Sequence, residues 1–241
     1  KSLGDIVRLA SSRESLKDLD LIILAFTNRS GSNAVGDFLS TELELPMFGE
    51  PLNRPNVEKA LAASEFADSW PDLGSYIQLL RREGSRRVTM KANVQQLRDL
   101  LRAKVHLNAG SFKIIHIGRE DVVAQAVSVL FAFTTNSFIA TSATEPDATP
   151  VPYDFEKLQQ ILAGINRSNL LIRLLCDLHD VQSARVAYED IMSHPAEGLL
   201  AVAESLGLSK RLEEAKPERF VSSRFLQQTS SAKSDMVSRF R

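Results

Sequence analysis

The sequence predicts an α/β fold with a central parallel sheet flanked by helices, and three observations support this class. Short apolar runs rich in branched side chains alternate along the chain with longer segments whose apolar residues recur at helical spacing. Such alternation is typical of a parallel sheet covered by helices on both faces. The chain has 241 residues, of which 44% are hydrophobic and 24% are charged. This length and composition favour one sizeable globular domain over two small ones.

The amino-terminal half is expected to supply the first strands. Residues 2–19 are expected to form an amphipathic helix, because apolar side chains recur there on one face. The unbroken apolar run over 21–26 is typical of a buried strand, and a helix is expected after it at 33–42. A short strand that ends in a proline-restricted loop is expected within 45–53. The other elements expected in this half are helices at 56–67, 72–84 and 94–104, and a strand at 88–91.

The carboxy-terminal half continues the alternation. A buried strand is expected at 112–117, and the turn after it leads into a helix at 122–134. A polar, proline-rich loop follows at 141–152. The remaining elements expected here are a long helix at 154–180, a last strand at 184–188 and a helix at 196–206 that Gly207 closes. The expected organisation is therefore a helical extension at 1–20, an α/β core at 21–208 and a charged, serine-rich carboxy-terminal segment at 209–241. This last segment is expected either to stay unstructured or to close over the ligand site.

The turn after the first strand carries the clearest functional signal. The run over 21–26 delivers the chain to a turn of small residues that holds one guanidinium, Arg29, and a helix begins next. A strand, a small-residue turn and a helix together aim free backbone N–H groups and the positive end of the helix dipole at an anion. The nucleotide-binding pattern Gly-x-x-x-x-Gly-Lys-Ser/Thr is absent, and the chain contains no Gly-Lys pair. The sequence therefore predicts an anion site that differs from that of an ordinary ATPase or GTPase.

Four charged residues are expected at one edge of the sheet. Arg29, Glu50, Lys91 and Arg119 each lie at or just after the end of an expected strand. Ligands of open parallel sheets bind outside the carboxyl ends of the strands, so a single cleft could hold all four side chains.

A second anion element is expected after the strand at 112–117. Arg119 stands where strand meets helix, and Ser128 lies on the helix that follows. A planar guanidinium with a hydroxyl is well suited to bind a phosphate dianion. The alternative is structural: Arg119 would pair with Glu120 or Glu189, and Ser128 would bond to its own helix.

Several functional classes are disfavoured. The formal net charge of −1 argues against a protein that grips nucleic acid through global charge. The single Cys176 leaves neither an intramolecular disulfide nor a cysteine metal site, and the four histidines are dispersed, so no metal is expected. No apolar stretch approaches the ~18–20 residues that span a bilayer, and the first twenty residues do not resemble a signal peptide. A cytoplasmic location is expected.

Three segments in order carry a family resemblance. Asn-Arg-Ser-Gly-Ser at 28–32, Gly-Glu-Pro at 49–51 and the stretch at 115–128 resemble the bacterial trehalose 2-sulfotransferase family, a group that includes lipopolysaccharide sulfotransferase-like proteins. The resemblance continues through Met90-Lys91, 186–191 and 234–241, and so spans nearly all of the chain beyond residue 20. It implies a P-loop-like sulfotransferase fold and 3′-phosphoadenosine 5′-phosphosulfate as the sulfuryl donor. It also implies a hydroxyl of a carbohydrate or glycolipid as the acceptor, and a homodimer.

The resemblance also implies roles for individual residues. Arg29 and the carboxylate of Glu50 would be catalytic, with Glu50 as the general base. Arg119 and Ser128 would hold the 3′-phosphate of the donor. The residues that would cradle the 5′-phosphosulfate are Arg29, Ser30, Gly31, Ser32 and Asn33. Lys91 and Asn53 are the candidate residues for binding the acceptor.

The chain departs from the family pattern at several positions. Asn33 stands where the family commonly has threonine, Gln227-Gln228 where it has an Arg-Gln pair, and Met236 where it has tryptophan. Near Glu50 the chain continues with Leu-Asn-Arg-Pro, so a changed acceptor is expected and trehalose is not assumed. Two alternatives stay open: a non-catalytic relative that binds a nucleotide or a protein, and a P-loop-like kinase, which the missing Gly-Lys pair disfavours.

Overall fold

A single four-stranded parallel sheet forms the centre of the protein in the computed structural model, which describes residues 3–45, 47–66, 69–136, 150–207 and 230–241. The spatial order of the strands is β2-β1-β3-β4, and every neighbouring pair is parallel. The strands are β1 (Asp20–Phe26), β2 (Arg87–Asn93), β3 (Ser111–Gly118) and β4 (Ser183–Ala187). The predicted α/β class with a parallel sheet flanked by helices is confirmed.

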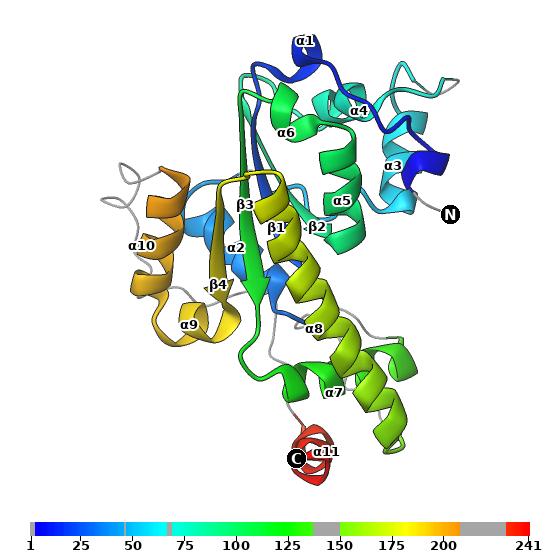
Figure 1. The fold of residues 1–241 in the computed structure, drawn as a ribbon, viewed down its shortest axis with the longest axis vertical. Coiled ribbons are helices and arrows are strands. Elements are labelled where there is room, and N and C mark those ends of the chain that lie inside the picture. The colour runs from blue at the N-terminus through cyan, green and yellow to red at the C-terminus, as the bar shows by residue number, and fades with distance from the viewer. Residues whose placement is uncertain (1–2, 46, 67–68, 137–149, 208–229) are drawn as a thin grey trace.

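Helices cover both faces of this sheet (Figure 1). One face carries α2 (Ser32–Glu42), α9 (Tyr188–Ser193) and α10 (Pro195–Leu206). The other carries α5 (Val94–Arg102) and the upper part of α8 (Phe155–Leu178). Successive side chains of a strand point to opposite faces, so Leu21, Ile23 and Ala25 enter one apolar core while Ile22 and Leu24 enter the other. A strand buried on both sides needs an unbroken apolar run, and this explains the sequence of β1.

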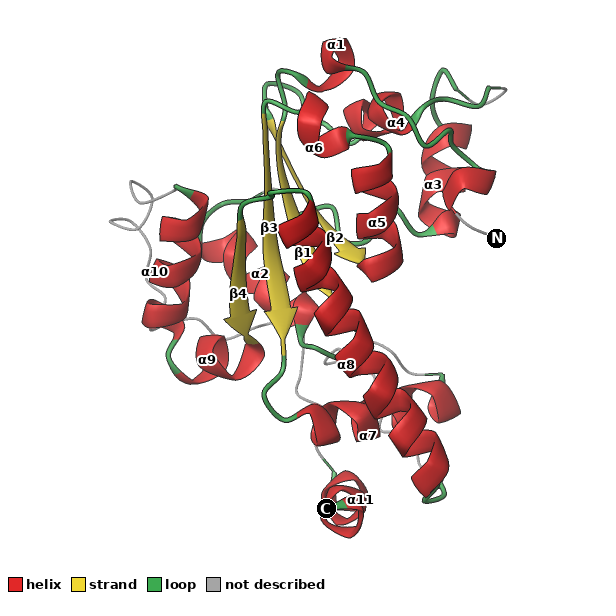
Figure 2. Cartoon of the chain, in the orientation of Figure 1, coloured by secondary structure: helices red, strands yellow, loops and turns green. Residues whose placement is uncertain are grey.

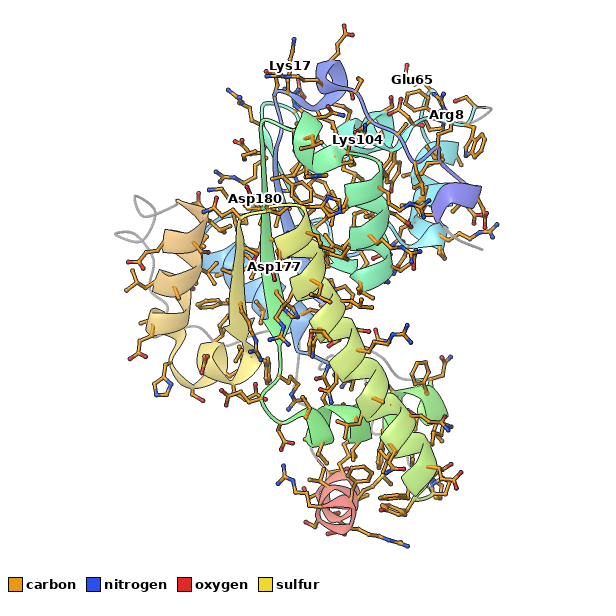
Figure 3. The ribbon with its side chains drawn as sticks, viewed as in Figure 1. Arg8, Lys17, Glu65, Lys104, Asp177 and Asp180 are labelled. Atoms are coloured by element: carbon orange, nitrogen blue, oxygen red, sulfur yellow. The ribbon has the colours of Figure 1, made fainter. Side chains whose placement is uncertain are left out.

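The first of these cores extends into a group of short elements beside α5. These are the 3-10 turn Leu3–Asp5, α1 (Arg13–Leu16), α3 (Arg54–Ala62), α4 (Leu73–Leu79) and α6 (Val105–Asn108). Figure 3 shows Lys17 and Lys104 near the amino-terminal ends of the strands, with Arg8 and Glu65 to one side of them. This end of the molecule lies opposite the carboxyl edge of the sheet.

A separate helical lobe lies beyond the carboxyl ends of the strands. It consists of α7 (Val122–Thr135), the amino-terminal part of α8 and α11 (Ser231–Phe240). Figure 2 shows that the described part of this lobe contains helices and loops only, and that the strands point toward it. Its own apolar cluster includes Leu130, Leu158 and Met236. The lobe therefore borders the edge of the sheet at which the sequence places the charged residues.

Several predicted elements differ from the structure. The single helix expected over 2–19 is wrong: the chain makes a 3-10 turn, pairs Arg8 with Asp72, and starts α1 only where Ser12 caps it. The strand expected within 45–53 is reduced to one bridge between Met47 and Thr89. Helices α6, α9 and α11 were not predicted. Most of the loop expected at 141–152, and the carboxy-terminal segment through 229, lie outside the described residues.

Candidate active site

The β1–α2 turn places its backbone at the carboxyl edge of the sheet. Arg29 and Gly31 both have left-handed backbone conformations, with φ angles of 61° and 83°. Position 31 needs glycine for its backbone conformation and also because no side chain fits there. A Cβ atom at this position would lie 2.1 Å from Cδ2 of Tyr188. The tyrosine ring at the start of α9 thus packs directly against the turn. Any side chain at position 31 would displace either the ring or the turn.

Gln125 of α7 holds the same turn from the side of the helical lobe. Its Nε2 donates to Thr27 Oγ1 at 2.9 Å and to the backbone oxygen of Asn28 at 2.8 Å. The residue is fully buried, so these bonds persist without competition from water. Ser30 and Ser32 are buried in the turn, and among the described residues the Ser30 hydroxyl has no hydrogen-bond partner. The turn is therefore anchored on two sides before any ligand is bound.

A mixed-charge corner lies on the α2 side of this turn. It consists of Asn33, Glu50, Asn53 and Lys91. The Lys91 ammonium lies 3.0 Å from Glu50 Oε1 and also donates to Asn33 Oδ1, while Asn53 Nδ2 donates to Glu50 Oε2 at 2.6 Å. The side chain of Lys91 is only 7% exposed, whereas that of Glu50 is 31% exposed. The ammonium is thus enclosed, and the carboxylate retains a face that a ligand can reach.

Strand register explains why these side chains meet. Lys91 of β2 pairs with Leu24 of β1, so both side chains point to the face covered by α2. The backbone N–H of Lys91 donates to the oxygen of Gly49 at 2.7 Å, which brings the Gly-Glu-Pro loop beside β2. The Asn56 amide donates to the backbone oxygen of Glu50 at 2.7 Å and holds the loop from α3.

Gln96 of α5 extends the hydrogen-bond network of the mixed-charge corner beyond Asn53. Its Nε2 donates to Asn53 Oδ1 at 2.8 Å, and its Oε1 accepts from the backbone N–H of Asn93. The Asn93 side chain in turn accepts from the N–H of Gln96, which makes a capping box at the start of α5. The amide of Asn53 is therefore held in one orientation, with its nitrogen toward Glu50. Sequence analysis did not select Gln96, although Asn-Val-Gln-Gln at 93–96 carries the capping pattern.

A cationic corner lies on the other side of the turn, next to the helical lobe. It consists of Arg29, Arg119, Ser128 and Lys233. Arg29 Nε donates to Ser128 Oγ at 3.0 Å. Arg119 Nε lies 3.3 Å from Glu189 Oε1, and its guanidinium lies 5.3 Å from the centre of the Tyr188 ring. Ser128 thus accepts a hydrogen bond from Arg29, whereas Arg119 pairs with Glu189, as the structural alternative expected.

The cations of this corner act on one another electrostatically. Burial lowers the pKa of Arg29, and the positive charge of Arg119 lowers it further. Burial, together with the charges of Arg29 and Arg119, lowers the pKa of Lys233 to about 8. Burial raises the pKa of Tyr188, against the opposing effect of Arg119. Arg119 is therefore close enough to both Arg29 and Lys233 to disfavour their charged forms.

Besides Gln96, sequence analysis missed two members of the site, Tyr188 and Lys233. Tyr188 follows a short, partly exposed strand, and its contact with Gly31 depends on two strands far apart in sequence. Lys233 lies in a segment that reads as a charged tail, and its helix packs on α7. The motif order gave a signal for Tyr188, since Tyr-Glu-Asp at 188–190 lies within the family resemblance. No local signal distinguished Lys233 from other lysines.

A sequence model of the Stf0 sulphotransferase family matches residues 87–241, which is more than half of the chain. The chain belongs to this family of sulfotransferases. The matched segment includes Lys91, Arg119, Ser128, Tyr188 and Lys233 of the site. No curated protein matches the chain.

The fold of this sulfotransferase also has a solved counterpart. The sulfotransferase domain from the Synechococcus PCC 7002 olefin synthase superposes with a TM-score of 0.50 at 15% sequence identity. The match covers 95% of this chain and 98% of that domain. At this identity the likeness shows the fold alone, and it confirms the predicted P-loop-like sulfotransferase architecture.

Two further findings concern the described residues of this sulfotransferase. They contain no group of three or more histidine, cysteine, aspartate or glutamate side chains placed to hold a metal ion. Nor do they contain a helix with both the length and the apolar character needed to cross a bilayer.

Proposed function

We propose that this sulfotransferase moves a sulfuryl group from 3′-phosphoadenosine 5′-phosphosulfate to a hydroxyl of a carbohydrate or glycolipid, with Glu50 as the general base. One observation carries the proposal: a reachable carboxylate and a cluster of cations flank the same anchored turn at the carboxyl edge of the sheet. A group-transfer enzyme needs both, because one side must accept a proton while the other stabilises negative charge.

The cationic corner fits a donor that carries phosphate groups at both ends of its ribose. Arg29 and Lys233 are held near Arg119 although burial and like charge disfavour the charged forms of both. A bound phosphate dianion would offset this repulsion and would accept hydrogen bonds from the guanidinium groups and from Ser128. Arg29 belongs to the turn and also contacts Ser128, so it can interact with either end of the donor. By the family resemblance, Arg119 and Ser128 hold the 3′-phosphate.

The residues of the β1–α2 turn would hold the transferring end. The bound donor supplies an activated sulfuryl group whose departing phosphate gains negative charge. Arg29 and the backbone N–H groups from Ser30 to Asn33 are already fixed by Gln125 and Tyr188, so they can stabilise this charge without rearranging. Ser30 offers a buried hydroxyl beneath the turn. Preorganisation of this kind is a large part of catalysis in related group transfers.

The mixed-charge corner would receive the acceptor. Glu50 accepts the proton of the attacking hydroxyl, and Asn53 and Lys91 hold its carboxylate in place. Because both carboxylate oxygens already have partners inside the protein, the hydroxyl approaches from the exposed face of Glu50. Amide, ammonium and carboxylate groups that largely neutralise each other suit a neutral polyol better than a charged acceptor. Lys91 and Asn53 are thus the proposed acceptor-binding residues.

We also propose that the protein forms a homodimer through α8. Four leucines on its solvent side (170, 171, 174 and 178) are 38–78% exposed and form a stripe at helical spacing. Two antiparallel copies of α8 would bury this stripe and bring the exposed Arg167 of one copy next to Asp177 of the other. Figure 3 shows Asp177 near the carboxy-terminal end of α8. Sedimentation should give a dimer for the wild type and a monomer for Leu174→Glu, and an unchanged mass for the variant would disprove this interface.

Calorimetric titration with 3′,5′-adenosine bisphosphate tests the donor site directly. The wild type should bind it, and Arg119→Ala should weaken binding by about 10- to 100-fold, as expected for loss of a charge-assisted hydrogen bond. Adenosine 5′-monophosphate, which lacks the 3′-phosphate, should lose much less affinity. Arg8→Ala, at the opposite end of the molecule, serves as the matched control (Figure 3). Equal weakening for both nucleotides would show that Arg119 does not bind the 3′-phosphate.

Mass spectrometry of reactions with the phosphosulfate donor and a panel of sugars and glycolipids tests the transfer itself. A sulfated product is expected with at least one acceptor. Bisphosphate binding without any transfer would favour the non-catalytic alternative. Magnesium-dependent turnover of ATP, without use of the phosphosulfate, would favour a kinase instead.

A further inference from the structure

Helix α11 is fixed against the helical lobe at several points. Met236 is buried among apolar side chains of α7 and α8, and the ring of Phe240 lies 5.3 Å from that of Phe155. The terminal Arg241 donates to Asp121 at 2.8 Å, directly before α7 begins. These contacts place α11 beside the strand-to-helix junction that carries Arg119. The helix is thus a fixed wall of the cationic corner.

Lys233 lies on the inner face of this wall. It precedes Met236 by three residues and Phe240 by seven, which are the spacings of one helix face. Its ammonium lies 5.3 Å from the centre of the Phe131 ring of α7. An ammonium over an aromatic face retains its charge at lower cost than one in a purely aliphatic site. The side chain is half-buried and directed inward, unlike the lysines Lys17 and Lys104 at the far end of the molecule (Figure 3).

We propose that Lys233 is the third cation of a pocket for a phosphate dianion, formed together with Arg29, Arg119 and Ser128. The proposal rests on the proposed function, and it assigns Lys233 to the 3′-phosphate of the donor. Two guanidinium groups and an ammonium from three separate segments converge there, and a dianion is the ligand whose charge such a set matches. Lys233 contributes a compact point charge, whereas Arg119 contributes a planar pair of donors.

Lys233 makes binding in this pocket depend on pH in a defined direction. Burial, Arg29 and Arg119 lower its pKa to about 8 in the free protein. Tyr188 and Glu189 lie beside Arg119, and Asp121, which pairs with Arg241, is also within electrostatic reach of Arg119. A bound dianion favours the charged lysine, so binding takes up a proton above about pH 8.

The size of this effect follows from the charged fraction. Between pH 7 and pH 9 that fraction falls from about nine-tenths to about one-tenth, so affinity for the dianion should fall about tenfold. An arginine at the same place would stay charged over this range.

Calorimetric titrations at pH 7 and pH 9 with 3′,5′-adenosine bisphosphate and adenosine 5′-monophosphate test the proposal. The wild type should lose about tenfold in bisphosphate affinity between the two pH values and much less in monophosphate affinity. Lys233→Gln should bind bisphosphate weakly and equally at both pH values. Lys233→Arg should bind it well and lose most of the pH dependence, which a merely structural lysine would not cause. Lys17→Gln is the matched control.

The outcomes separate this inference from the proposed function. If the wild type binds bisphosphate but Lys233→Gln binds it equally well, Lys233 is not in the pocket and the donor site stands. A fall in affinity that persists in Lys233→Arg also overturns the inference. If the folded wild type fails to bind bisphosphate at either pH, both proposals fall.

Discussion

The two corners of the site differ in how their charged side chains are arranged. In the mixed-charge corner, the Lys91 ammonium has Glu50 and Asn33 as partners, and Asn53 and Gln96 extend the network into α5. In the cationic corner, Arg119 pairs with Glu189, while burial and the charge of Arg119 lower the pKa of both Arg29 and Lys233. The mixed-charge corner thus places opposite charges side by side. The cationic corner places like charges close together, so an anionic ligand would offset their repulsion.

This difference suggests a division of labour between the two sides of the β1–α2 turn. A satisfied network holds its groups in fixed orientations, which suits a carboxylate that must meet a neutral hydroxyl at the correct angle. A group of like charges costs stability in the free protein, and binding sites commonly accept such a cost because ligand binding offsets it. Variants that affect one side alone can therefore test whether the two corners act separately.

The largest expected effect is on turnover, from the mixed-charge corner. Glu50→Gln keeps the shape of the side chain and an oxygen toward Lys91, but it removes the proposed proton acceptor. Turnover should fall by about 10²- to 10⁴-fold, the usual contribution of a general base. Affinity for 3′,5′-adenosine bisphosphate should stay nearly unchanged, because that ligand is assigned to the other side of the turn. Initial rates and calorimetry measure the two quantities.

Glu65→Gln is the matched control for this variant, since Glu65 is exposed and lies far from the site (Figure 3). A Glu50→Gln enzyme with normal turnover would remove Glu50 from the role of base. A large loss of bisphosphate affinity would show that the two corners do not act separately.

An intermediate effect is expected at the turn that joins the corners. Gly31→Ala places a methyl group against the Tyr188 ring, and it also puts alanine at a φ of 83°. The free energy of unfolding should fall by more than the about 1–2 kcal/mol that a left-handed backbone alone costs a non-glycine residue. Gly84→Ala isolates that backbone cost, because Gly84 has a φ of 74° and no neighbour within 4 Å of the added carbon. Equal losses in chemical denaturation would show that the Tyr188 contact does not constrain the turn.

The strands of the sheet were predicted well because each is marked by a pattern in its own local sequence. The apolar run of β1 is the pattern that a strand buried on both faces requires, and β3 shows the same pattern. The helix predicted for the amino-terminal segment was wrong because of a contact with a distant part of the chain. Its apolar residues do enter a core, but Arg8 pairs with Asp72 through the backbone instead of continuing a helix. Helical periodicity alone does not reveal such a long-range bridge.

The position of a candidate site residue was predictable where a short motif placed that residue at or just after the end of a strand. Arg29, Glu50, Lys91 and Arg119 all lie at the carboxyl edge of the sheet, and the structure divides them between two corners. The division was not predictable, because the Lys91–Glu50 pair depends on the register of β2 against β1. The contribution of Lys233 depends on how α11 packs against α7, which no local pattern in its sequence encodes.

The smallest effects are expected when lysine is replaced by glutamine in each of the two corners. Lys91→Gln should lower the free energy of unfolding by about 1–3 kcal/mol, because it replaces the buried ammonium that bonds Glu50 and Asn33 with a shorter, uncharged amide. Lys233→Gln should instead raise the melting temperature slightly at pH 7, because it removes a cation from beside Arg29 and Arg119. The pKa of Lys233 is about 8 in the folded protein against 10.5 for a free lysine. Between these values the unfolded chain binds more protons than the folded one, so the wild type gains stability as pH rises.

The melting temperatures of wild type and Lys233→Gln should therefore converge between pH 8 and pH 10, whereas the deficit of Lys91→Gln should already be present at pH 7. Calorimetric melting of the three proteins without nucleotide gives both comparisons in one series. A Lys233→Gln protein that is less stable than the wild type at pH 7 would mean that the lysine stabilises the fold. The cationic corner would then be as satisfied as its neighbour, and the electrostatic contrast between them would not exist.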